Sequence, residues 1–169
     1  MNRKASHIFS LLAVFAIAFG ALFSAAPVKA ASGPTIVEIA LSVNADSGEF
    51  STLIAAVQYA GLVDALNGNR QFTVFAPTDA AFAKLGLNAG NITSLPKDML
   101  TNILLFHVAP GERFAADVVS ASKVRTLNKS FAAVEVNDMG AYIDGAKIIA
   151  TDIDASNGVI HVIDSVMLP

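Results

Sequence analysis

The 169-residue sequence contains no cysteine. Without thiols the chain has no disulfide, no thiol nucleophile, no thiolate-bound metal and no cysteine for a lipid anchor. A chain of this length buries enough apolar surface to fold without covalent cross-links. We therefore expect its stability to come from an ordinary packed core.

Tryptophan is absent as well, and basic residues are few. Three of the eleven basic residues (Arg3, Lys4 and Lys29) precede position 31, whereas all fourteen acidic residues follow it, so residues 31–169 carry a net charge of −6. Nucleic-acid binding needs clustered Lys and Arg, so this charge excludes nucleic acid as a partner. The same residues include only two tyrosines, which disfavours a polysaccharide site built on aromatic side chains.

The N-terminal residues have the three parts of a secretory signal peptide. Arg3 and Lys4 form a basic start, Ile8–Phe23 is almost wholly apolar, and Val28-Lys29-Ala30 forms an A-x-A-like cleavage site. The apolar run is shorter than the roughly 20 residues that span a bilayer. We predict cleavage before Ala31, and an uncleaved membrane anchor is the alternative.

This division predicts one folded domain. We expect a signal peptide over residues 1–30, a linker over 31–34 and a single domain over 35–169, a length that suits one hydrophobic core. Contact with the membrane is then limited to the cleaved segment. The protein is expected to be secreted, and to be either extracellular or periplasmic.

The first half of the domain carries helical patterns. Thr35–Ala45 is apolar on one face, and the apolar residues of Phe50–Val57 fall at i, i+3, i+4 and i+7. A further pattern begins after Pro96 and runs to Phe106. Between these helices Gln71–Ala76 has the composition of a strand.

The second half has the character of a sheet. From Val124 onward, short β-rich runs alternate with Asn, Asp and Gly residues that are typical of tight turns. Helices in the first half and strands in the second predict an α+β fold, with the helices packed on a largely antiparallel sheet.

The segment Asn157–Pro169 is almost continuously apolar, and β-branched residues dominate it. Apolar residues at both alternating sets of positions predict a strand that is covered on both faces. His161 and Asp164 stand within this run. For His161 we favour a core histidine whose ring nitrogens bond to the backbone or to a nearby side chain.

Two segments resemble the signatures of the fasciclin (FAS1) domain family, namely FTVFAPTDAAF at 72–82 and GVIHVIDSVMLP at 158–169. A third, LLFHV at 104–108, lies where the family has a central Tyr-His element. The resemblance covers about residues 35–169. It implies a wedge of mainly antiparallel strands with helices packed against it. It also implies a secreted single-domain protein of bacterial type with a non-enzymatic role in cell adhesion or matrix contact.

The resemblance also suggests particular residues, because in several animal members the Tyr-His element and an Asp-Ile element bind integrins. Phe106 replaces the usual Tyr, and Arg-Gly-Asp does not occur. We expect Phe106 to lie partly in the core and His107 to lie nearer the surface. The candidate adhesion contacts are Phe106, His107, Asp152 and Ile153, and the structural residues of the motifs are Thr78, Asp79, His161 and Asp164.

The sequence shows no catalytic, metal or cofactor pattern. It lacks G-x-S-x-G, H-E-x-x-H and a phosphate-binding loop, and its aspartates lack the spacing of a calcium loop. We therefore predict no enzyme activity, no metal and no cofactor. The expected partner is a surface or matrix protein or a glycan, bound by a domain that is monomeric or weakly self-associating. The alternative function is an extracellular small-molecule or polysaccharide-binding module.

Overall fold

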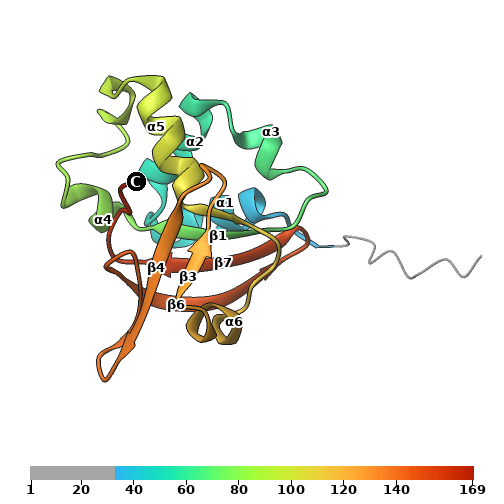
Figure 1. The fold of residues 1–169 in the computed structure, drawn as a ribbon. Helices are drawn as coiled ribbons and strands as arrows, with labels where there is room; N and C mark the ends of the chain where they lie inside the picture. Colours follow the sequence, from blue (N-terminus) through green and yellow to red (C-terminus); the bar gives the residue numbers. More distant parts are fainter. Residues whose placement is uncertain (1–32) are drawn as a thin grey trace, which may run out of the picture. The chain divides into compact units, whose positions relative to one another are not determined.

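The computed structural model describes residues 33–169 (Figure 1). The predicted signal peptide and the start of the predicted linker lie outside these residues. The elements are α1 Ile36–Ser47, α2 Ser51–Ala60, α3 Val63–Leu66, β1 Phe72–Pro77, α4 Asp79–Ala83, the 3-10 helix η1 Ile92–Ser94, α5 Lys97–Phe106, β2 Val108–Pro110, α6 Ala115–Ser120, β3 Lys123–Arg125, β4 Phe131–Asn137, β5 Gly140–Ile143, β6 Ala146–Ala155 and β7 Gly158–Ile163.

The first helix, α1, is closed at both ends by the residues that the sequence offers. Thr35 Oγ1 accepts a hydrogen bond from the Glu38 backbone N–H (3.3 Å), and the Glu38 carboxylate accepts one from the Thr35 N–H (2.7 Å). This reciprocal pair is a capping box. At the other end Gly48 adopts a left-handed conformation with φ 73°. Of the twelve residues of α1, only Ile36 is fully buried.

All seven strands of the described residues form one sheet in the order β2-β1-β7-β6-β5-β4-β3. Phe72 pairs with Gly158 and Pro77 with Ile163, so β1 and β7 run parallel, whereas every other strand pair in the described sheet is antiparallel. The α+β prediction is confirmed. The parallel pair, next to the edge strand β2, joins the two segments that carry the family-like motifs.

The strands β1 and β7 are covered on both faces, as the apolar sequence of Asn157–Pro169 predicts for β7. All six residues of β1 and all six of β7 are buried. Because side chains alternate along a strand, Val74 and Ala76 enter one core with α1, α2 and α5, while Phe75 enters a second core with α6 and β3–β5. In Figure 1, α1, α2, α3 and α5 lie on one side of β6 and β7, and α6 lies on the other.

The strand predicted within Asn157–Pro169 covers only Gly158–Ile163. The chain then leaves the sheet, and Met167 is buried in the second core. At the start of β7, Gly158 has φ 147°, and a Cβ placed there would lie 1.9 Å from the carbonyl oxygen of Phe72. Only glycine therefore allows β1 and β7 to pair at this point.

Candidate functional site

The candidate contacts Phe106 and His107 are both buried, with exposed fractions of 3% and 2%. Phe106 ends α5 inside the second core, whereas His107 follows it and faces the helix side of the sheet. The expectation that His107 lies nearer the surface is therefore wrong. The physical reason is the segment around Met167, which packs over the end of α5 and bonds to the imidazole.

Both ring nitrogens of His107 are engaged. Nδ1 lies 2.8 Å from the carbonyl oxygen of Ile103 and donates to it, while Nε2 accepts from the backbone N–H of Met167 at 3.0 Å. These partners fix the neutral Nδ1–H tautomer. Burial lowers the pKa of His107 to about 4, although the bond to Ile103 acts in the opposite direction.

His161 is held in the opposite tautomer on the other face of the sheet. Its Nε2 donates to the carbonyl oxygen of Arg113 (2.9 Å), and its Nδ1 accepts from the backbone N–H of Asp152 (3.3 Å). The ring also stacks on Phe75, with centroids 5.6 Å apart. Burial lowers the pKa of His161, against the opposing effects of the Arg113 bond and the Asp152 charge. This arrangement is that of a structural core histidine.

Asp152 and Ile153 point in different directions. Asp152 is exposed and has φ 60°, within an irregular stretch of β6. Its carboxylate accepts a hydrogen bond from the Ala115 N–H (2.7 Å) at the start of α6. Ile153 is half-buried and packs against the helix-side core. Of the four candidate contacts, only Asp152 is therefore exposed in this structure.

The other motif residues make local structural contacts. Thr78 Oγ1 accepts from the Ala81 N–H (3.2 Å) and caps α4, and the Asp79 carboxylate accepts from the Thr52 N–H (2.8 Å) in the first turn of α2. Burial alone would raise the pKa of Asp164. Hydrogen bonds from Ser165 and Lys147 and the nearby charge of Lys84 outweigh that effect and lower it.

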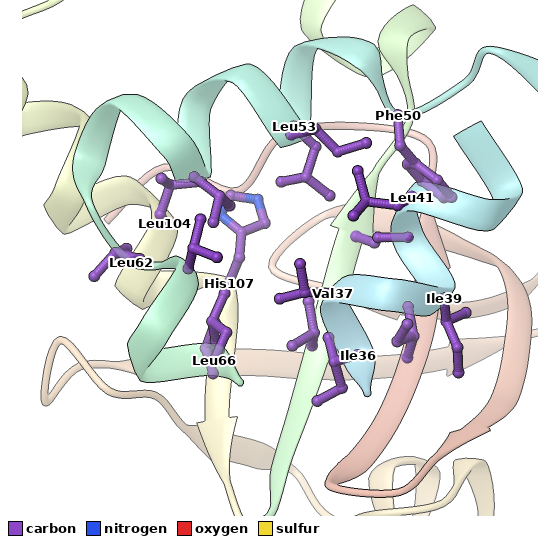
Figure 2. A pocket seen from close by; sticks show the side chains of 18 of the residues that line it. Ile36, Val37, Ile39, Leu41, Phe50, Leu53, Leu62, Leu66, Leu104 and His107 are labelled. Carbon is purple, nitrogen blue, oxygen red and sulfur yellow. The ribbon is translucent and has the colours of Figure 1, made fainter. Parts of the chain in front are cut away.

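Sequence reasoning missed a large apolar cavity on the helix side of the sheet. Its volume is about 120 Å³, and it is lined by residues of α1, α2, α3, α5, β1, β2, β6 and β7. In Figure 2, Ile36, Val37, Ile39 and Leu41 of α1 stand on one side of this space. Leu62, Leu66, Leu104 and His107 stand on the opposite side. One feature of the sequence indicates the cavity. The apolar stripe of α1 is wider than packing against a single neighbouring element requires.

A cavity of this volume has an energetic cost. Protein interiors are close-packed, and an unfilled volume costs about 24 cal/mol per Å³. For a fully enclosed space of about 120 Å³ this corresponds to about 3 kcal/mol of lost stability, and an opening to solvent lowers that cost. Native domains have only about 5–15 kcal/mol in total, so the cavity is a substantial structural feature.

Sequence reasoning also missed the role of Asn157, whose buried amide anchors the start of α1. Its Oδ1 accepts from the Ile36 N–H (2.9 Å), and its Nδ2 donates to the carbonyl oxygens of Leu66 (2.6 Å) and Gly68 (3.2 Å). The sequence marks Asn157 only as a turn residue. The structure shows that it also joins the β6–β7 turn to α1 and α3.

Within 33–169 no cluster of three or more His, Cys, Asp or Glu side chains is placed to hold a metal ion. Across the same residues no helix has the length and apolar character needed to cross a bilayer.

The mixed sheet, the helices α1, α2, α3 and α5 on one of its faces and the two buried motif strands define a β-wedge domain of the α+β class. The chain belongs to the fasciclin family, because the Fasciclin domain profile matches residues 48–169. A solved FAS1 domain pair from the insect cell adhesion molecule fasciclin I has the same fold. Its TM-score is 0.64 at 22% identity, over 80% of this chain and 51% of that one.

Relatives in sequence come from bacteria and animals. Protein sll1483 of Synechocystis sp. is 48% identical over 142 residues, which are 82% of this chain and 75% of the relative. Immunogenic protein MPB70 of Mycobacterium bovis is 33% identical over 72% of this chain and 64% of its own length. Transforming growth factor-beta-induced protein ig-h3 of Sus scrofa is 33% identical over 71% of this chain but only 18% of its own length.

Proposed function

We propose that this protein is a secreted, non-enzymatic interaction domain that acts in cell adhesion or matrix contact. The observation that supports this most is membership of the fasciclin family over residues 48–169, together with the fold shared with a domain pair from an insect cell adhesion molecule. The predicted signal peptide supports an extracellular or periplasmic location. The partner is a surface or matrix protein or a glycan, and the domain is monomeric or weakly self-associating.

The burial of the motif residues restricts the contact surface. Phe106 and His107 support the fold from inside, and Ile153 faces the helix-side core, so Asp152 is the candidate that a partner reaches directly. We place the adhesion contact on the exposed face around Asp152, where β6 meets the start of α6. The net negative charge of residues 31–169 favours a partner with exposed basic groups.

The test of the adhesion role compares cells that lack the protein with complemented cells. We expect the deletion to reduce attachment to a surface and the formation of cell aggregates, and complementation to restore both. Unchanged attachment and aggregation after deletion would overturn the adhesion role.

The contact face is tested with a matched pair of neutralising variants in the complemented strain. Asp152→Asn removes the charge but keeps an amide that can cap α6 and that tolerates positive φ. Asp154→Asn is the control, because Asp154 is also exposed on β6. We expect Asp152→Asn alone to reduce attachment. Equal attachment in both variants would show that the contact does not include Asp152, and it would not contradict the adhesion role itself.

The second candidate function is an extracellular small-molecule-binding module, and the cavity is the observation that favours it. A polysaccharide would need polar groups and flat aromatic rings. Of the two phenylalanines in the lining, Phe50 packs on this side of the sheet whereas the ring of Phe75 packs in the second core, and the rest of the lining is almost wholly aliphatic. Its chemistry therefore suits an apolar molecule rather than a sugar.

A further inference from the structure

We propose that the cavity bounded by α1, α2, α3 and the β1–β7 side of the sheet binds the aliphatic chain of a lipid-class molecule. The chain enters tail first, and its polar end stays at the mouth. Binding at this cavity does not depend on the adhesion role. The cavity is apolar and lies on the helix side of the sheet, whereas the proposed adhesion contact is the exposed face around Asp152, beside α6.

The lining excludes a polar ligand. Twenty of the 22 lining residues are apolar, and the two others are Gln58 and His107. Within the described part of the chain, no charged side chain faces this space. A charged or strongly hydrogen-bonding ligand group buried there would lose its water without gaining a partner. A hydrocarbon chain has no hydrogen bonds with water to lose on entry, and it gains contacts with the aliphatic walls.

The polar groups of the lining fix the orientation of the ligand. His107 has both ring nitrogens bonded to backbone groups, so it offers the cavity only its ring carbons. Gln58 on α2 is exposed, and Leu41 on α1 is 45% exposed. The cavity therefore opens to solvent between α1 and α2, and the amide of Gln58 at this mouth is available to a polar head group.

Hydrogen bonds at both ends of α1 keep the cavity open. At the N-terminal end Asn157 holds the Ile36 N–H, and Thr35 Oγ1 donates to Asn67 (2.8 Å). At the C-terminal end the Asn44 side chain accepts from the Phe50 N–H (3.1 Å) and from Ser51 Oγ (3.0 Å). Because α1 is held at both ends, it does not move onto the sheet and fill the cavity, although the residues in the middle of the helix bury little surface.

The volume sets the length of the buried segment. An apolar cavity of about 150 Å³ stays dry and takes benzene, so the cavity of about 120 Å³ accommodates a segment of about six carbons. Each methylene that enters should tighten binding about fourfold. Further methylenes reach the mouth and add little. The chain length at which affinity stops rising therefore measures the depth of the site.

The experiment titrates the purified protein with 1-alkanols from 1-butanol to 1-dodecanol by isothermal titration calorimetry. We expect saturable binding of one molecule per chain, with an affinity that rises about fourfold per methylene and then levels off. The absence of saturable binding at every chain length would overturn the proposal. So would an affinity that rises without levelling while several molecules bind per chain, because this is the behaviour of non-specific adsorption.

Two variants of α1 make a matched pair. Ala40→Leu adds three carbons to a residue that lines the cavity, whereas Ala45→Leu makes the same change at an exposed position of the same helix. We expect 1-octanol to bind at least tenfold more weakly to Ala40→Leu and unchanged to Ala45→Leu. Equal affinities in the two variants would contradict this site.

A measurement on the unmodified protein covers the case in which Ala40→Leu does not fold. Saturating 1-octanol should shift the methyl resonances of Leu53 and Leu104, which line the cavity. It should leave those of Ile143, which is buried in the second core, in place. Shifts of equal size in both cores, or in neither, would overturn the assignment.

Discussion

The Nε2 atom of His107 accepts a hydrogen bond from the backbone N–H of Met167 at 3.0 Å, across 60 positions of sequence. Through this bond the end of α5 is attached to the segment that follows β7. The bond requires a neutral imidazole, because a protonated Nε2 has no lone pair to accept with. The stability of the domain is therefore coupled to the protonation of one buried side chain.

The first prediction concerns this coupling. The pKa of His107 is about 4 in the folded state and about 6.5 in the unfolded chain, so the unfolded chain binds the proton first as the pH falls. The contribution of His107 to stability is complete above about pH 6.5 and decreases toward pH 4, by about 3 kcal/mol in total. The lowered pKa of His161 acts in the same direction.

Urea unfolding at pH 7.5, 5.5 and 4.5 measures this effect. The free energy of unfolding should fall at each step, and the fall should be smaller in His107→Gln, which cannot titrate. The same free energy at pH 7.5 and 4.5 would show that His107 is not buried as a neutral imidazole.

The second prediction concerns Phe106. Its ring is only 3% exposed in the second core, so Phe106→Ala should lower the free energy of unfolding by about 3–5 kcal/mol. Met99 lies on the same helix and is 53% exposed, so Met99→Ala should change it by less than about 0.5 kcal/mol. Denaturant melts of both variants decide between a core ring and a surface anchor. A small effect for Phe106→Ala, with lost attachment of cells, would favour the anchor.

The third prediction concerns Gly158. A Cβ at this position would overlap the Phe72 carbonyl, so Gly158→Ala should cost about 3 kcal/mol or more by forcing β1 and β7 apart. Gly145 also has positive φ (77°), but nothing lies within 4 Å of its added Cβ. Gly145→Ala should therefore cost only about 1–2 kcal/mol. Thermal melts compare the two, and equal costs would mean that the close approach at Gly158 is relieved elsewhere.

The fourth prediction concerns processing. The basic start, the apolar run Ile8–Phe23 and the small residues around Ala30 predict that the exported protein begins at Ala31. Mass spectrometry of the exported protein measures its N-terminus. An intact Met1 on most exported molecules would contradict cleavage and favour a retained anchor.

The sequence predicts those features of the fold that are determined by residues close together in the chain. The helices predicted at Thr35–Ala45 and Phe50–Val57 and the two-sided burial of β7 follow from local patterns. The parallel pairing of β1 with β7 does not, because it joins residues from opposite ends of the domain. Only the family resemblance grouped these two segments, as two motifs of one domain.

The candidate site was harder to predict from the sequence than the fold. The position of His107 just after an apolar helix gives no sign of the C-terminal segment that covers it, so its burial was missed. Asp152 and Ile153 form a dipeptide whose two side chains enter different environments, because successive side chains along a strand point to opposite faces. The cavity is a volume between helices and sheet, and a pattern of apolar residues does not distinguish a filled space from an open one.

The parallel pairing of β1 and β7 also affects the order in which the chain acquires structure. Phe72 meets its partner Gly158 only after 86 further positions, so this strand pair cannot form until nearly all of the domain has emerged from the ribosome. Native contacts at such sequence separation slow folding. A chain synthesised only as far as β6 therefore lacks the parallel strand pair, together with the buried residues that β7 adds to both cores.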